Sequence, residues 1–155
     1  MRRVFRALAA CSFSSVLLLS AATRIDNPKT FVTDVYRRLI ADQSTHSTYT
    51  PPDDIYTPRL KTLMRDDERK AKGEVGCLDF VFWVNAQDWT ITHLTVTSAD
   101  EGQERKTVAS KFLNGGEPQE IHVDFRLVAG RWLLDDAHSV SAPPWTLSEI
   151  LKCAP

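Results

Sequence analysis

Apolar residues in the first half of the chain repeat with the period of an α-helix. Between residues 28 and 42 they recur at spacings of one, three and four, which predicts an amphipathic helix. Asn27-Pro28 is typical of a helix start, because a capping side chain precedes a proline at the first helical position. Thr57-Pro58 repeats this signal, and a second apolar stripe predicts a helix from residue 58 to about residue 72.

From residue 90 onward the apolar positions alternate with polar ones, which is typical of β-strands. Four segments show this pattern: 90–98, 106–113, 120–128 and 131–138. Short, turn-like connections separate them, which predicts an antiparallel meander of four strands. Thr146-Leu-Ser-Glu149 then matches a capping box and predicts a short C-terminal helix.

Helices that precede a run of strands are typical of the α+β class. We therefore predict N-terminal helices packed against a curved four-stranded antiparallel sheet, followed by the short C-terminal helix. This order of elements resembles the nuclear transport factor 2-like superfamily (cystatin-like cone), in which a bent sheet wraps the helices and leaves a pocket.

Five segments also resemble a bacterial envelope family within that superfamily, catalogued as domain of unknown function 3828. They are "FVTDVYRRLI", "YTPRLKTLM", "NAQDW", "GRWLLDDA" and "TLSEIL". In this order they span about residues 30–152. The resemblance implies the cone fold, a pocket at its mouth and an envelope compartment, and it implies no particular reaction.

The first 22 residues differ from the rest of the chain. "MRRVFR" is basic, residues 7–23 are uncharged, and Ser20-Ala21-Ala22 supplies small residues at a cleavage site. This layout is typical of a secretory signal peptide cleaved after Ala22. We therefore expect a periplasmic (in a Gram-negative cell) or secreted protein, with residues 23–155 as a single domain. An uncleaved signal anchor and a lipid anchor on Cys11 are the alternatives.

The composition is that of an ordinary globular protein, with 43% hydrophobic and 25% charged residues. Residues 1–22 contain three arginines and no acid, so without them the net charge of −1 becomes −4. The remaining chain has no basic run, so we expect no nucleic-acid partner, and we expect no membrane span in the mature form.

Two cysteines, Cys77 and Cys153, lie outside the predicted signal peptide. Because export implies an oxidising compartment, we predict that they form a disulfide bond. Two unrelated thiols are the alternative. Neither cysteine lies in a CxxC motif or near a histidine cluster, so we expect no metal and no cofactor.

A polar cluster follows the apolar run in "CLDFVFWVNAQDW", residues 77–89. Trp83 fits a core position. On a structural interpretation, Asn85, Gln87 and Asp88 satisfy backbone groups where the chain bends into the first strand. On a functional interpretation, Gln87 and Asp88 face the mouth of the cone, and a desolvated Asp88 acts as a general base.

Strand periodicity places His93 on the same side as Trp89 and Ile91. Asp88 and His93 are therefore our candidate acid–base pair. Together with Trp83 and Gln87 they are also our candidate ligand-binding residues.

Other polar residues favour structural roles. His122 and Asp124 alternate with apolar residues, so we expect them on a solvated face. Asp135 and Asp136 are neighbours in a predicted strand, so we expect them on opposite faces, unable to share a proton. Trp145 either staples the terminal helix or anchors a partner.

These patterns favour an exported, non-catalytic module that binds another envelope component, a toxin-neutralising immunity protein being one form. The alternative is a small-molecule-binding protein or an acid–base enzyme of the isomerase or dehydratase type, with its pocket at the cone mouth. A homodimer formed through the sheet is also left open.

Overall fold

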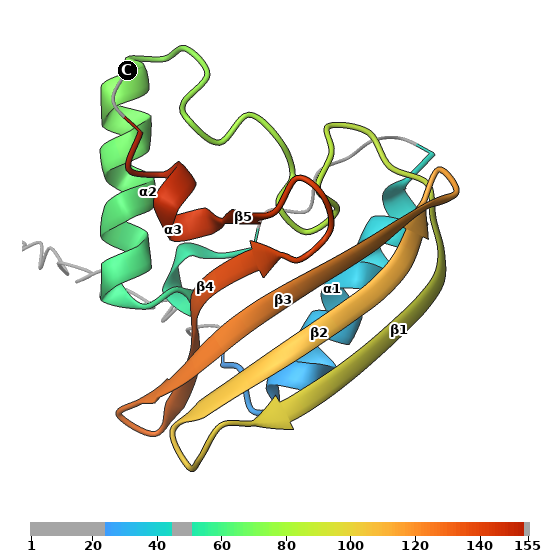
Figure 1. The fold of residues 1–155 in the computed structure, drawn as a ribbon. Helices are drawn as coiled ribbons and strands as arrows, with labels where there is room; N and C mark the ends of the chain where they lie inside the picture. The colour runs from blue at the N-terminus through green and yellow to red at the C-terminus, as the bar shows by residue number, and fades with distance from the viewer. Residues whose placement is uncertain (1–23, 45–50, 154–155) are drawn as a thin grey trace, which may run out of the picture.

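Helices and an antiparallel sheet follow one another in the computed structural model, which describes residues 24–44 and 51–153 (Figure 1). The helical elements are α1 (Pro28–Asp42), the 3-10 turn η1 (Asp53–Ile55), α2 (Pro58–Ala71) and α3 (Leu147–Ile150). The strands are β1 (Ile91–Asp100), β2 (Arg105–Asn114), β3 (Glu117–Val128), β4 (Arg131–Ser139) and β5 (Trp145–Thr146). The predicted α+β class is confirmed. The predicted signal peptide and Cys11 lie outside the described residues.

The two long helices begin where the sequence predicts. The Asn27 side chain accepts a hydrogen bond from the backbone N–H of Thr30 (3.1 Å), and Pro28 follows it. Thr57 caps α2 in the same way through the N–H of Leu60 (3.4 Å). These caps satisfy backbone donors that the helix itself leaves without partners. No helix among the described residues is both long enough and apolar enough to cross a membrane.

The sheet is an open antiparallel meander in the order β1-β2-β3-β4-β5. Gly115 and Gly116 form the two-residue turn between β2 and β3, with φ of +59° and +94°. Positive φ at both central residues is the requirement of a tight hairpin turn, and it fixes the register of β2 against β3. This confirms one of the short connections predicted between the strands.

The predicted count of four strands is wrong. The fifth strand, Trp145–Thr146, pairs with Ser139 and His138 of β4. A strand of two residues is too short to produce an alternating pattern, so the sequence does not reveal it. β5 and β1 are the two edges of the sheet.

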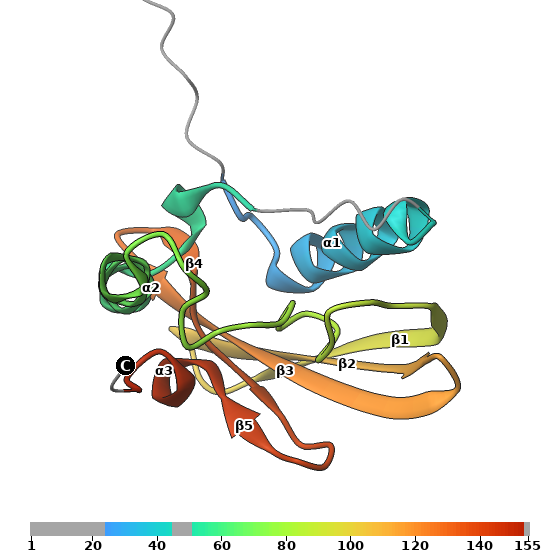
Figure 2. The same ribbon diagram turned by 90° about the horizontal axis from the view of Figure 1, so that it is seen from above.

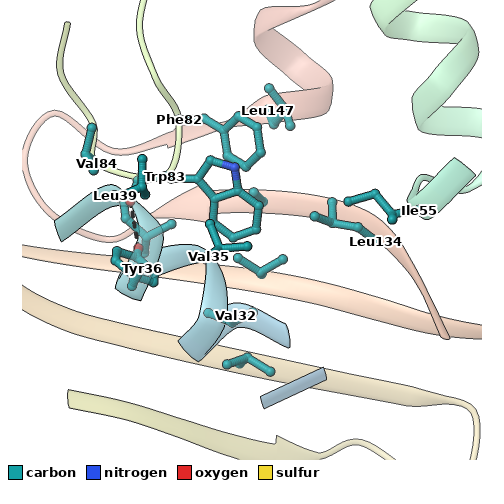
Figure 3. Packing of buried hydrophobic residues seen from close by; sticks show 14 of the residues in the cluster. Val32, Val35, Tyr36, Leu39, Ile55, Phe82, Trp83, Val84, Leu134 and Leu147 are labelled. Atoms are coloured by element: carbon teal, nitrogen blue, oxygen red, sulfur yellow. Dashed lines mark hydrogen bonds between the residues drawn. The ribbon is translucent and has the colours of Figure 1, made fainter. Parts of the chain in front are cut away.

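The hydrophobic core lies between α1 and one face of the sheet (Figure 2). α1 contributes Val32, Val35, Tyr36 and Leu39, and the inward strand positions include Val108, Phe112, Ile121, Val123 and Phe125. Trp83 lies at the centre of the cluster, with its ring edge-on to those of Phe31 (6.4 Å) and Tyr36 (6.3 Å), as Figure 3 shows for the labelled residues. Large aromatic side chains therefore fill the interior beneath α1.

The predicted disulfide bond is present between Cys77 and Cys153, whose Cα atoms are 6.1 Å apart. It connects the segment that follows α2 to the end of the chain after α3. α2 and α3 both lie beside β4, so the bond holds this end of the fold together (Figure 1).

Candidate functional site

The four residues predicted to bind a ligand lie in different environments. Trp83 is buried, whereas Gln87, Asp88 and His93 are exposed. The side chain of Gln87 donates to the backbone carbonyl of Asp79 (3.1 Å). His93 lines one of four hollows on the surface of the described part of the chain, and Trp83, Gln87 and Asp88 line none of these four.

A β-bulge sets the direction of His93. The register of β1 against β2 shifts between Thr92 and Thr95, and His93 has a φ of +56°. Trp89 and Ile91 are buried, while His93 points to solvent. The bulge therefore interrupts the alternation that the sequence-based prediction assumed.

Asn85 shows how the polar cluster at residues 85–88 serves the fold. Its Oδ1 accepts a hydrogen bond from Nε1 of Trp145 (2.6 Å), and its Nδ2 donates to Oε1 of Gln119 (3.0 Å). The Trp145 ring also packs edge-on against Phe80, at 5.4 Å between centroids. Asn85 thus ties the bend to β3 and β5, and Trp145 holds the C-terminal segment in place.

The face of the sheet opposite α1 carries polar side chains in cross-strand rows. On β3, His122, Asp124 and Arg126 alternate with the buried Val123 and Phe125. The rows, in register, are Arg105–Arg126, Thr107–Asp124–Asp136, Ala109–His122–His138 and Lys111–Glu120. We call this surface of β2, β3 and β4 the outer face. Neighbouring rows are about 6.8 Å apart, the length of two strand residues.

A hollow of about 380 Å³ opens on the outer face, and we call it the outer hollow. Its charged lining consists of Arg59, Arg105, Lys106, Arg126, Glu101, Asp124, Asp135 and Asp136, with His122 and His138 beside them. With neutral histidines the formal charges of this lining cancel. Sequence patterns do not reveal this site, because its residues come from α2, three strands and the turn between β1 and β2, and only the fold brings them together.

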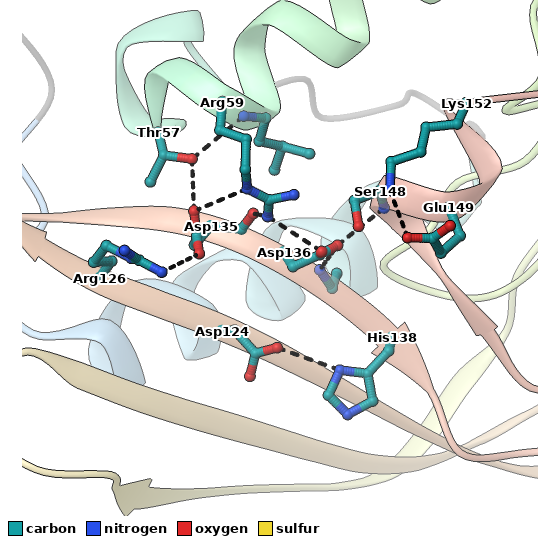
Figure 4. A network of polar contacts seen from close by, with 12 residues as sticks. Thr57, Arg59, Asp124, Arg126, Asp135, Asp136, His138, Ser148, Glu149 and Lys152 are labelled. Atoms are coloured by element: carbon teal, nitrogen blue, oxygen red, sulfur yellow. Dashed lines mark hydrogen bonds and ion pairs between the residues drawn. The ribbon is translucent and has the colours of Figure 1, made fainter.

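Asp135 and Asp136 lie side by side in this hollow, and the prediction that they point to opposite faces is wrong. Asp136 pairs with Asp124, while Leu134 pairs with Phe125, so Asp135 is the extra residue of a bulge. Nε of Arg59 lies 3.5 Å from Asp135, and its Nη2 lies 3.2 Å from Asp136 (Figure 4).

Both aspartates have fixed partners from neighbouring elements. Asp135 accepts a hydrogen bond from the hydroxyl of Thr57 (2.9 Å) and pairs with Nη2 of Arg126 (3.4 Å). Asp136 accepts the backbone N–H groups of Ala137 (2.9 Å) and Ser148 (3.0 Å). The two carboxylates therefore connect α2 and α3 to β4.

Asp124 lies close to a histidine ring and a threonine hydroxyl. Its Oδ2 is 3.4 Å from Nδ1 of His138, and its Oδ1 is 2.6 Å from the hydroxyl oxygen of Thr107. The same hydroxyl lies 2.9 Å from Oε1 of Glu101. The rings of His138 and His122 meet edge to face at 4.9 Å.

A second hollow, of about 360 Å³, lies on the same surface beside the β2–β3 hairpin. His93 and Glu120 line this hairpin hollow, while His122 lines the outer hollow. Nε2 of His122 lies 2.7 Å from Oε1 of Glu120, and this contact lowers the pKa of Glu120. The pair connects the two hollows, so the outer face is one continuous surface.

Within residues 24–44 and 51–153, no three histidine, cysteine or acidic side chains gather as a metal-ligand set. The chain matches no family model and no curated protein. It is similar to one solved structure, a phospholipid-binding protein from Ralstonia solanacearum in complex with a phospholipid. The two chains share 15% identity over 78% of this chain and 68% of the other, with a TM-score of 0.34.

Proposed function

We propose that this chain is an exported, non-catalytic binding module whose ligand or partner lies against the outer face. The observation that supports this is the contrast between the two sides of the sheet. Trp83 and its aromatic neighbours fill the side under α1, whereas two of the four hollows open on the other side of the sheet and the other two lie beside α2. Small-molecule sites are concave and few per protein, so the hollowed side is the better candidate.

Export is supported by two independent features. The N-terminal 22 residues have the layout of a signal peptide, and the chain carries a disulfide bond. We place the protein in the envelope or outside the cell. On the resemblance of its segments, we assign it to the family catalogued as domain of unknown function 3828, which has the nuclear transport factor 2-like cone.

The hydrogen bonds of the acidic residues in the outer hollow support a non-catalytic role. Asp135 and Asp136 accept hydrogen bonds from fixed partners, which suits structural acceptors better than proton donors. Asp88 and His93, the candidate acid–base pair, share none of the four hollows. A protein partner in the envelope, including a toxin neutralised by an immunity protein, would bind across the continuous outer face.

Site-specific photo-crosslinking tests which face binds. A photoreactive residue replaces Lys111 on the outer face or, as a control, Lys29 on the exposed side of α1, in cells that export the protein. We expect an adduct at Lys111 and none at Lys29. Equal labelling at both positions, or an adduct at Lys29 alone, would contradict the proposal.

Mass spectrometry of the recovered chain tests export, because cleavage after Ala22 leaves Thr23 as the first residue.

A further inference from the structure

Arg105 and Arg126 lie directly opposite one another on β2 and β3, at one end of the outer hollow. Like charges in this position destabilise an antiparallel sheet. Arg126 has Asp135 as a partner at 3.4 Å. The side chain of Arg105 is exposed and has no hydrogen bond or ion pair within the part of the chain that the structure describes. This row therefore presents positive charge that an anionic group would balance.

The next row, around Thr107, lacks a positive charge for its carboxylates. The hydroxyl of Thr107 lies 2.6 Å from an oxygen of Asp124 and 2.9 Å from an oxygen of Glu101. A threonine hydroxyl has one proton, so it donates to only one of these carboxylates at a time. The other carboxylate then faces an oxygen lone pair. A cationic donor placed between Glu101 and Asp124 would satisfy both.

Apart from Arg105, whose side chain pairs with neither carboxylate, the nearby cations are engaged elsewhere. Arg59 pairs with the two aspartates of the bulge, and Lys106 pairs with Asp100 (3.1 Å). His138 is the basic group that contacts Asp124, and it is a full cation only when protonated. A positive charge for the Glu101–Asp124 pair is therefore best supplied by a ligand.

The row of Arg105 and the row of Thr107 are separated by two residues of β2, about 6.8 Å along the strand. They share one hollow of about 380 Å³ whose lining charges cancel. A simple anion or cation would meet as many like charges as opposite ones there, whereas a molecule that carries both charges gains at each end. The volume is that of a small-molecule site.

We infer that the outer hollow binds a small zwitterion of the short-peptide type. Its carboxylate lies between Arg105 and Arg126, and its ammonium lies between Glu101 and Asp124. This inference rests on the proposed function, because it names the ligand class of the outer face. Arg105 is the main specificity residue for the carboxylate, since its guanidinium fork is not committed to another group.

Titration calorimetry of the mature chain tests the inference with three matched probes. Glycylglycine carries both charges, N-acetylglycylglycine lacks the ammonium, and glycylglycine amide lacks the carboxylate. We expect glycylglycine to bind and each blocked analogue to bind at least about tenfold more weakly, because each loses charge-assisted hydrogen bonds. Equal binding of a blocked analogue, or no heat with glycylglycine at millimolar concentration, would overturn the inference.

Arg105→Gln isolates the carboxylate end of the site. Because Arg105 is exposed and has no side-chain partner among the described residues, the variant should melt as the parent does. It should bind glycylglycine about tenfold more weakly and no longer distinguish it from the amide. Lys29→Gln on α1 removes the same charge from the opposite side of the fold and should bind as the parent does. Unchanged affinity in Arg105→Gln would refute the assignment.

The two proposals fail in different ways. An adduct at Lys111 but not at Lys29, with no selective binding of glycylglycine, would remove the zwitterion and keep the outer face as the binding surface. An adduct at Lys29 equal to that at Lys111 would remove the outer face itself. A protein captured at Lys111 without dipeptide binding would indicate a macromolecular partner instead of a small ligand.

Discussion

The hydroxyl of Tyr36 donates a hydrogen bond of 2.6 Å to the backbone carbonyl oxygen of Trp83. Both residues are buried, and the bond joins the middle of α1 to the segment that precedes β1. In Tyr36→Phe the ring remains, but the buried carbonyl loses this donor. We expect the free energy of unfolding to fall by about 1–3 kcal/mol, measured by urea denaturation. A variant as stable as the parent would show that the bond contributes nothing.

The same tyrosine predicts a dependence of stability on alkaline pH. Burial raises the pKa of Tyr36 well above its ordinary value of 10. Above about pH 10 the unfolded chain releases the proton of this hydroxyl, whereas the folded chain keeps it. Stability is therefore unaffected by this group below about pH 10 and falls as the pH rises further. Unfolding curves should show a steeper alkaline loss in the parent than in Tyr36→Phe, and parallel losses would contradict the assignment.

The disulfide bond between Cys77 and Cys153 predicts a stability that depends on redox conditions. It joins residues 76 positions apart, so it should contribute roughly 4 kcal/mol by restricting the unfolded chain. Cys153→Ser should lower Tm under oxidising conditions and change it little when a reductant is present. The double variant Cys77→Ser/Cys153→Ser controls for the free thiol. Identical melting of parent and variant without reductant would argue against a contribution from the bond.

The close contact between Gly76 and Asp67, beside the disulfide bond, predicts that substitutions at these two residues have non-additive effects on stability. The buried Asp67 accepts the backbone N–H of Cys77 (2.9 Å), and a Cβ added at Gly76 would collide with its carboxylate. Gly76→Ala should therefore lower the free energy of unfolding by about 1–3 kcal/mol. In an Asp67→Ala background the same change should have little effect, because the colliding group is gone. Additive effects in this double-mutant cycle would refute the contact.

The elements of this fold were predictable because each depends on local chemistry. Asn27-Pro28 and Thr57-Pro58 fix the helix starts, and the turn at residues 114–117 depends on two glycines that accept positive φ. These signals need only a few neighbouring residues. The sequence therefore predicted the order of the three α-helices and the first four strands, and the single pairing of Cys77 with Cys153.

The candidate site was harder to predict because it depends on register and on bulges. Alternation along β3 places His122 and Asp124 on one face, but only the pairing with β2 and β4 brings Thr107 and His138 to them. A bulge brings Asp135 beside Asp136, where strict alternation separates them. Bulges leave no mark in a period-two pattern, so the outer hollow does not follow from the sequence.

The bulge on β4 also predicts which arginine on α2 matters for stability. Arg59 contacts both Asp135 and Asp136, so Arg59→Gln leaves two neighbouring carboxylates without their shared cation. Because Arg59 is half-exposed, we expect a modest loss of about 1 kcal/mol at low salt that shrinks as salt screens the charges. Arg65→Gln is the matched control, since Arg65 lies on the same helix and is 3.9 Å from the exposed Asp53. Equal losses in the two variants would mean that the bulged pair does not depend on Arg59.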